Sequence, residues 1–262
     1  MADFEILEDN LRATFRAYAQ AKESGEAREM PGVLLVCAGV EFAMFNAALL
    51  TAPAANANEL DRRVAMAAVH FHARALPWSF WICEDWLTAH VRKQADNVFW
   101  KRGLHLVVEL PGMLAQRVLP PARPLPHLEC CRVGDDLTRS AFSYIMSICF
   151  GIPLSISRQI YLPERLWRSH FTGYLGYVDG NPISTTVTVV AGGTVGVYAV
   201  ATLPAHQRNG YAEAMVRHAL EQARRSSGID RTILQSSPAA VSLYERLGYR
   251  TVTRYAVYAS RP

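Results

Sequence analysis

The distribution of apolar positions separates strand-like from helix-like segments along the chain. Residues 194–203 (TVGVYAVATL) carry no charge and are rich in β-branched side chains, which is typical of a buried strand. After residue 210, apolar residues recur instead at helical spacing, at Ala212, Met215, Val216, Ala219, Leu220 and Ala223. A strand at 231–236, a short helix that starts at Ser237-Pro238 and a strand at 249–259 follow. The pattern predicts an α/β fold.

The rest of the chain alternates in the same way. Helices are predicted at 1–20, 59–75, 86–103, 137–150 and 155–168, and strands at 77–83, 104–110, 171–178 and 183–190. The helix at 1–20 is amphipathic, and we expect it to pack on the N-terminal half. A proline-rich stretch at 120–126 cannot continue a helix or a central strand. It predicts a linker between two units, 1–119 and 127–262.

Composition argues against several classes of protein, namely nucleic-acid-binding, disulfide-rich, zinc-binding and membrane-spanning proteins. The chain has 262 residues, half of them hydrophobic, and a net charge of +4 without a block of basic residues, so a nucleic-acid partner is not expected. The five cysteines form no Cys-x-x-Cys pair, which favours free thiols in the cytoplasm over a disulfide framework or a zinc site. No apolar run approaches the ~18 residues of a membrane span. The acidic start argues against a signal peptide.

A candidate phosphate-binding turn lies between the strand at 194–203 and the following helix. Its sequence is Gln207-Arg208-Asn209-Gly210-Tyr211-Ala212. The first backbone amides of a helix have no partner within the helix, and a glycine lets the backbone approach a ligand closely, so such a turn can hold an anion. Arg208 can add a direct contact to a phosphate. Taken alone, the turn is equally compatible with an ordinary loop at a helix start.

A second motif, Leu243-Tyr244 followed by Gly248-Tyr249, stands downstream of this turn. The order of strand, Gln-x-x-Gly-x-Ala turn, long helix, strand, short helix with Leu-Tyr and then Gly-Tyr resembles the GNAT superfamily of acyl-CoA-dependent N-acyltransferases. The resemblance covers residues 126–262. It implies a mixed central sheet flanked by helices, with acetyl-CoA as the co-substrate.

The resemblance also implies roles for individual residues. The implied cofactor-binding residues are Gln207, Arg208, Asn209, Gly210, Tyr211 and Ala212 around the pyrophosphate, Val200, Ala201 and Thr202 beside the pantetheine arm, and Ser237, which stands where many members have asparagine. Tyr244 matches the tyrosine that commonly protonates the departing thiolate. An unperturbed phenol, with a pKa of ~10, carries that proton at neutral pH. The alternative interpretation of Tyr244 is a core tyrosine on an amphipathic helix.

No general base is assigned. Many members of the superfamily carry a glutamate on the fourth strand, whereas residues 194–203 contain no Asp, Glu or His. A water relay, a base elsewhere in the chain and an amine that arrives neutral all remain open. Glu129 and Asp179 are available carboxylates, although the Asp179-Gly180-Asn181-Pro182 sequence is explained by a hairpin turn.

The N-terminal half repeats the order of elements found in the C-terminal half, from the helix at 59–75 to the strand at 104–110. We therefore expect tandem GNAT-like domains, each with a mixed central sheet, of which the first is degenerate. Its candidate turn, residues 51–58, has no glycine and no basic residue, and Trp100 replaces the tyrosine. Because this order of elements is common in α/β proteins, coincidence is the alternative. In either case the first half is not expected to bind acyl-CoA.

The sequence favours an N-acetyltransferase that acts on a primary amine of a small molecule, with Tyr244 as the general acid. Residues 136–168, in the region that usually sets substrate choice in this superfamily, are mostly apolar and predict an apolar or weakly polar acceptor wall. A non-catalytic acyl-CoA-binding or regulatory module and a protein-interaction platform are the alternatives. Acetyl-CoA and the amine are the expected partners, without nucleic acid, membrane or metal, and a homodimer is left open.

Overall fold

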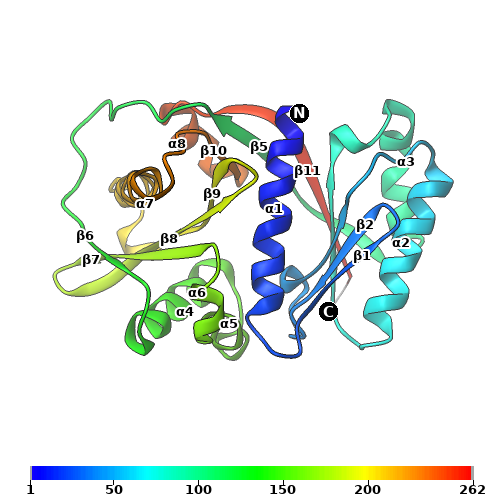
Figure 1. Ribbon diagram of the computed structural model, residues 1–262, viewed down its shortest axis with the longest axis horizontal. Helices are drawn as coiled ribbons and strands as arrows, with labels where there is room; N and C mark the ends of the chain where they lie inside the picture. Colours follow the sequence, from blue (N-terminus) through cyan, green and yellow to red (C-terminus); the bar gives the residue numbers. More distant parts are fainter. Residues whose placement is uncertain (1, 261–262) are drawn as a thin grey trace.

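The chain forms one mixed β-sheet flanked by helices (Figure 1). The computed structural model describes residues 2–260, and within them the strands follow the order β1-β2-β3-β4-β11-β5-β10-β9-β8-β7-β6. The N-terminal half contributes α1 (Asp3–Gln20), β1 (Glu26–Met30), β2 (Val33–Cys37), β3 (Asn46–Leu50), α2 (Ala57–His72), β4 (Ser79–Cys83), α3 (Ala89–Trp100) and β5 (Leu104–Ala115). The C-terminal half contributes β6 (Glu129–Arg132), α4 (Asp136–Phe150), α5 (Leu154–Tyr161), α6 (Glu164–Trp167), β7 (Phe171–Val178), β8 (Asn181–Ala191), β9 (Thr194–Thr202), α7 (Tyr211–Ser227), β10 (Thr232–Gln235), α8 (Val241–Arg246) and β11 (Arg250–Ser260).

The two halves are arranged symmetrically about the pair β11 and β5. The series β1-β2-β3-α2-β4-α3-β5 matches β7-β8-β9-α7-β10-α8-β11, and in each the only parallel pair is the third strand with the fourth. The last strands are exchanged. β11 lies between β4 and β5, and β5 lies between β11 and β10, all antiparallel. Each half therefore supplies a central strand to the other.

This arrangement confirms the mixed α/β fold class but differs from the prediction in the number of sheets. The sequence predicted a separate sheet for each of the units 1–119 and 127–262, whereas the exchange joins both into one sheet. Residues 116–128 contain neither helix nor strand, as a linker at 120–126 requires. The linker alone does not divide the molecule, because a strand from each side of it lies within the sheet of the other half.

Helix α1 lies between the two halves (Figure 1) and contacts β1 and β2 of one half and β8 and β9 of the other. Asn10 is fully buried, and its amide nitrogen donates to the carbonyl oxygens of Val189 (3.0 Å) and Ala191 (3.1 Å). The expectation that this helix packs on the N-terminal half is therefore wrong in part. The sequence shows one apolar face on this helix, but polar Glu8, Asn10 and Thr14 are buried as well. The helix is therefore buried on more than its apolar face.

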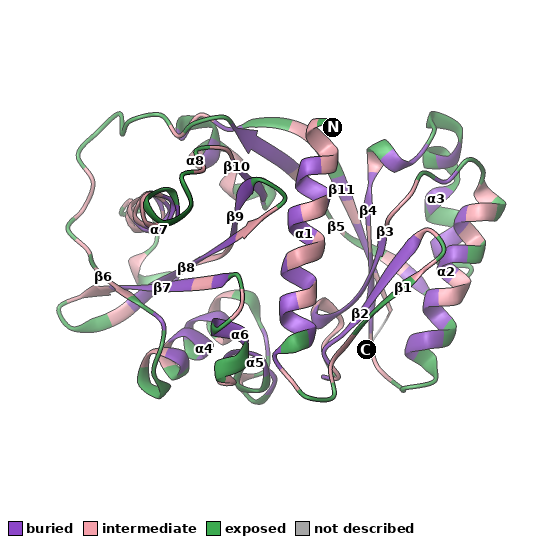
Figure 2. Cartoon of the chain, in the orientation of Figure 1, coloured by how far each residue is buried: buried purple, intermediate pink, exposed green. Residues whose placement is uncertain are grey.

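Many of the buried residues lie on the strands of the sheet (Figure 2). β2 and β3 are buried over their whole length. The apolar pattern did not predict β1, β2 or β3. The helix predicted at 155–168 is split into α5 and α6, because Pro163 cannot continue a helix. The strand predicted at 104–110 continues to Ala115 and thereby reaches β10. Within residues 2–260, no helix is long and apolar enough to cross a membrane.

Candidate active site

The parallel strands β9 and β10 are paired at one end only. Val195 pairs with Thr232 and Gly196 with Ile233, and the register stops there. β9 continues to Thr202, while β10 continues beside β5. The two strands therefore diverge, and they leave a gap in the sheet where residues 197–202 line a cavity.

β9 carries a bulge at the mouth of this gap. Its register with β8 shifts between Thr185 and Val187, so that two residues of β9 oppose one of β8, and Ala199 has a φ of 49°. The Thr185 hydroxyl donates to the Ala199 carbonyl oxygen at 2.8 Å. A bulge redirects the backbone groups of a strand, and here a β8 hydroxyl holds it in place beside the cavity.

The turn before α7 leaves the first helical amides without a side-chain cap. Arg208 and Gly210 have φ values of 67° and 87°, both in the left-handed region, and no side chain bonds the start of the helix. The side-chain nitrogen of Gln207 donates to the Thr202 carbonyl oxygen at 3.1 Å, which ties the turn to the end of β9. The amides of Tyr211 and Ala212 and the positive end of this 17-residue helix are thus available to an anion.

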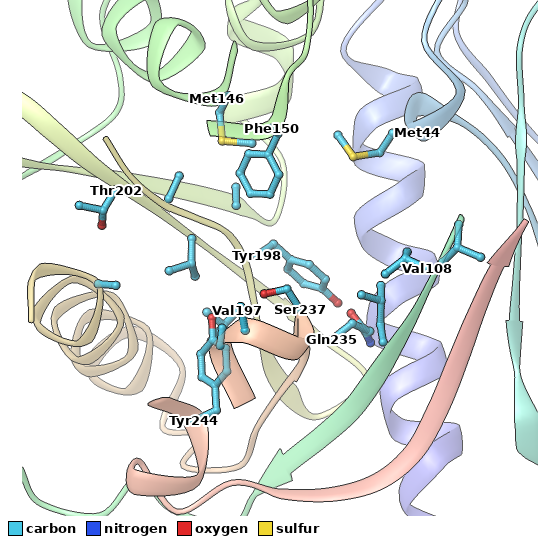
Figure 3. Close-up of a pocket in the computed structure, with 18 of the residues that line it drawn as sticks. Met44, Val108, Met146, Phe150, Val197, Tyr198, Thr202, Gln235, Ser237 and Tyr244 are labelled. Atoms are coloured by element: carbon cyan, nitrogen blue, oxygen red, sulfur yellow. The ribbon is translucent and has the colours of Figure 1, made fainter. Parts of the chain in front are cut away.

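Tyr244 extends from α8 into the same cavity. It is 6% exposed, and its ring packs edge-on against Tyr249 with the centroids 5.7 Å apart. The hydroxyls of Tyr249 and Thr232 share a hydrogen bond of 2.7 Å, which fixes the second ring. Figure 3 shows the Tyr244 hydroxyl directed toward β9 near Val197. Burial raises the pKa of Tyr244 above its ordinary value, so the phenol stays protonated at neutral pH.

These elements enclose a cavity of about 1260 Å³ (Figure 3). The predicted site residues that line it are Val200, Ala201, Thr202, Gln207, Arg208, Gly210, Tyr211, Ala212, Ser237 and Tyr244. Asn209 is the exception, because its side-chain nitrogen donates to the His206 carbonyl oxygen at 3.3 Å within the turn. The fold brings three separate segments of the sequence to one cavity.

Arginines gather around the turn, and Arg123, Arg208 and Arg246 line the cavity. Glu213, a carboxylate in the first turn of α7, accepts two 3.0 Å bonds from Arg217. Its other oxygen lies 4.0 Å from Arg246. The two guanidinium groups offset a charge that would otherwise repel a phosphate, so this end of the cavity suits an anion.

The linker covers the turn directly. A Cβ placed on Gly210 would lie 3.2 Å from Cδ of Pro126 and 3.8 Å from a guanidinium nitrogen of Arg123. Arg217 of α7 donates to the Leu119 carbonyl oxygen at 2.5 Å and holds the start of the linker. The sequence predicts this segment only as a linker, because a single arginine among prolines does not indicate a ligand.

Other lining residues were missed as well. Tyr198 and Gln235 flank the gap, and the N-terminal half adds Phe15, Met44, Trp81 and Val108. Tyr198 and Gln235 could have been noticed as polar residues on strands beside the turn. The general base stays unassigned, since β9 carries no carboxylate or imidazole. Among the described residues, no three His, Cys, Asp or Glu side chains gather in a way that could hold a metal ion.

The corresponding gap in the N-terminal half is closed. β3 and β4 are parallel neighbours like β9 and β10, but Ala54 and Leu87 add a further bridge, and the Ala54 amide donates to the Trp86 carbonyl oxygen at 2.9 Å. The buried guanidinium of Arg63 donates to the carbonyl oxygens of Ala52 (2.6 Å) and Pro53 (2.9 Å). Backbone and an arginine thus occupy the turn at 51–58, and the absence of a cofactor site in this half stays a prediction.

Solved GNAT proteins have this fold. A GCN5-related N-acetyltransferase from Kribbella flavida is similar with a TM-score of 0.70 at 18% identity, over 95% of this chain and 96% of that chain. One from Sphaerobacter thermophilus gives 0.59 at 16% identity, over 88% and 81%. A GCN5-related N-acetyltransferase-like protein from Streptococcus suis 89/1591 gives 0.58 at 10% identity, over 98% and 99%. The fold class is therefore that of GNAT proteins over nearly the whole chain.

Residues 141–249 match the model of the acetyltransferase (GNAT) family. The match includes β7 to β10, the turn before α7 and the helix that carries Tyr244. The match confirms the resemblance seen in the sequence for these residues of the C-terminal half. No curated protein matches the chain in sequence.

Proposed function

We propose that the protein is an N-acetyltransferase that transfers the acetyl group of acetyl-CoA to a primary amine of a small molecule. One observation carries the proposal: the gap beside β9, the turn before α7 and Tyr244 all line a single cavity. The match of residues 141–249 to the GNAT family model supports the acyl-transfer class. The free cysteines favour the cytoplasm as its location, and a homodimer stays open.

Acetyl-CoA is held along β9 in this proposal. Its pyrophosphate accepts hydrogen bonds from the amides at Gly210, Tyr211 and Ala212, with Arg208 as a charged partner. Gln207 and Asn209 hold the turn in shape through their bonds to backbone carbonyls. The pantetheine arm follows the backbone of residues 200–202, where β10 has diverged, and Ser237 lies on the facing wall.

The chemistry is a direct attack. The lone pair of the neutral amine forms a C–N bond with the thioester carbonyl carbon, and the tetrahedral intermediate then breaks its C–S bond. Tyr244 gives its proton to the departing sulfur, the nitrogen releases a proton to water, and water restores the phenol. The buried phenol suits this role because it is protonated when the thioester arrives.

A turnover assay tests the proposal. Release of free CoA thiol is measured with acetyl-CoA against a panel of amines, and binding of acetyl-CoA is measured by calorimetry. Tyr244→Phe keeps the ring that packs on Tyr249 and lowers kcat by about 10²–10⁴-fold with the Kd of acetyl-CoA unchanged. Tyr249→Phe is the matched control, since its hydroxyl bonds Thr232 and lies outside the cavity lining. Equal losses in the two variants contradict the assignment.

The second candidate function is a non-catalytic acyl-CoA-binding regulatory or interaction module. The lack of an acid or imidazole on β9 favours it. Such a module binds acetyl-CoA through the turn and acetylates no amine. Gly210→Glu, which puts a carboxylate into the turn, abolishes binding in either case. If the wild-type protein does not bind acetyl-CoA, both candidate functions fail.

A further inference from the structure

The cavity extends beyond the β9–β10 gap into the N-terminal half. We call this part the acceptor arm and define it by Phe15, Met44, Trp81, Val108, Phe150 and Tyr161, all of which line the cavity. The first four come from α1, the segment after β2, β4 and β5, and the last two from α4 and α5. Figure 3 shows Met44 and Phe150 on the same side of the cavity and Val108 on β5. The arm is thus built by both halves.

The acceptor arm is almost free of charge. Arg123, Arg208, Glu213 and Arg246 line the cavity at its cofactor end, around the turn and α8. Among the lining residues of the N-terminal half, Glu41 alone is charged, and it is exposed to solvent. The arm therefore offers no cation to pair with a carboxylate of an amino acid. A single solvated carboxylate is also too little to hold a polycation.

One buried polar group of the cavity lacks a partner. The side-chain nitrogen of Gln235 has no hydrogen-bond partner within residues 2–260. Buried donors are normally satisfied, and unpaired ones are costly. An uncharged oxygen of a ligand, such as a carbonyl or hydroxyl, would satisfy this group. The cavity thus combines an apolar surface with a neutral donor.

Trp81 is held rigidly in this arm. Its indole N–H donates to Oγ of Ser79 at 3.2 Å, and its ring packs edge-on against Phe15 with the centroids 5.2 Å apart. A fixed aromatic ring gives a large contact area at low cost in conformational entropy. Trp81 belongs to β4, the strand that β11 joins to the rest of the sheet, so the strand exchange delivers this ring to the cavity.

Resting on the proposed acetyl transfer, we infer that the acceptor is an amine on a bulky apolar or aromatic body without a carboxylate or further cations. The N-terminal half selects this body through Met44, Trp81 and Val108. The half that lacks a cofactor turn thus has a role of its own, as the specificity wall of the acceptor site.

Competing amines test the inference at saturating acetyl-CoA. Tryptamine and 2-phenylethylamine represent the apolar class, spermidine the polycations and L-lysine the amino acids. We expect kcat/KM for the two apolar amines to exceed that for spermidine and L-lysine by at least about tenfold. A preference for spermidine or L-lysine overturns the inference and leaves acetyl transfer standing.

Two variants locate the selection in the N-terminal half. Trp81→Ala raises KM for tryptamine by about tenfold or more, with the Kd of acetyl-CoA unchanged. Trp100→Ala, at a ring that is 62% exposed and outside the cavity lining, is the matched control and leaves KM unchanged. Met44→Glu adds a carboxylate to the arm and shifts preference toward spermidine, a gain that misfolding cannot mimic.

The readouts separate this inference from the proposed function. If acetyl-CoA binds but no amine is acetylated, the proposed function fails. If amines are acetylated and both Trp81→Ala and Met44→Glu leave the preference unchanged, the role of the N-terminal half is overturned while the transferase stands. An apolar preference lost in Trp81→Ala and inverted in Met44→Glu supports it.

Discussion

The Tyr198 hydroxyl donates a 2.9 Å hydrogen bond to Oδ1 of Asn10 and so joins β9 to α1. The same Asn10 side chain reaches backbone carbonyls at the β8–β9 turn through its nitrogen. It fits because the facing residue is Gly196, where a Cβ would lie 2.0 Å from Oδ1. One buried amide therefore fixes the N-terminal helix against the strand that lines the cavity.

Removing this amide should destabilise the protein. Asn10→Ala leaves carbonyl oxygens and the Tyr198 hydroxyl without their partner in a fully buried place, and we expect the free energy of unfolding to fall by about 2–3 kcal/mol. Urea unfolding measures the change. Asn97→Ala, at an exposed position on α3, serves as control and changes stability by less than about 0.5 kcal/mol. Similar losses in the two variants would contradict the role of Asn10.

Helix α7 has a glycine with positive φ at each end, so substitution at one end can serve as a control for backbone strain at the other. Gly210 and Gly228 have φ values of 87° and 72°, so alanine at either position costs about 1 kcal/mol of stability. Pro126 lies against Gly210, whereas nothing lies within 4 Å of a Cβ on Gly228. We expect Gly210→Ala to raise the Kd of acetyl-CoA about tenfold, or ~1.4 kcal/mol, and Gly228→Ala to leave it unchanged. Calorimetry gives both values, and equal effects on Kd would refute a binding role for the turn.

Each chain should bind one molecule of acetyl-CoA. The turn at 207–212 is open to the cavity, while the corresponding turn at 51–58 is filled by Arg63 and bridged to Trp86. Calorimetric titration is expected to give a stoichiometry near one and no heat with Gly210→Glu. A stoichiometry near two, or binding that survives in Gly210→Glu, would place a working site in the N-terminal half.

Stability should fall in alkaline solution. Burial raises the pKa of Tyr18 to about 12, above the ordinary value near 10 that the unfolded chain retains. The folded state therefore keeps a proton that the unfolded state releases, so this contribution is complete below pH ~10 and is lost as the pH rises toward 12. The loss is about 1.4 kcal/mol per pH unit for each such group. Urea midpoints across this range test it, and Tyr18→Phe should make the decline shallower by about one proton.

The residues around the turn before α7 that line the cavity could be identified because their patterns are local in sequence. Gly210 allows a left-handed backbone at a helix start. Tyr244 is identified by its place in the short helix α8, which ends just before Gly248. Both features depend on neighbours a few residues away. The apolar character of residues 136–168 likewise pointed to α4, whose Phe150 lines the acceptor arm.

The acceptor arm could not be predicted, because its other walls depend on which strands pair. Nothing in the apolar pattern of β5 or β11 distinguishes the observed exchange from pairing within each half. The position of α1 depends on Asn10 meeting the bare backbone at Gly196, a contact between residues nearly two hundred positions apart. Alternation of apolar residues identifies a strand and its buried face, but it does not identify the neighbour.

The exchange of β5 and β11 also sets an order of events during synthesis. β4 emerges from the ribosome long before β11, the strand that pairs along its edge. Until β11 arrives, a nascent chain presents β4 with open backbone groups, and such edges readily pair with other chains. The sheet of the N-terminal half is therefore completed only when the last strand has been synthesised. We expect the nascent chain to depend most on chaperones just before translation ends.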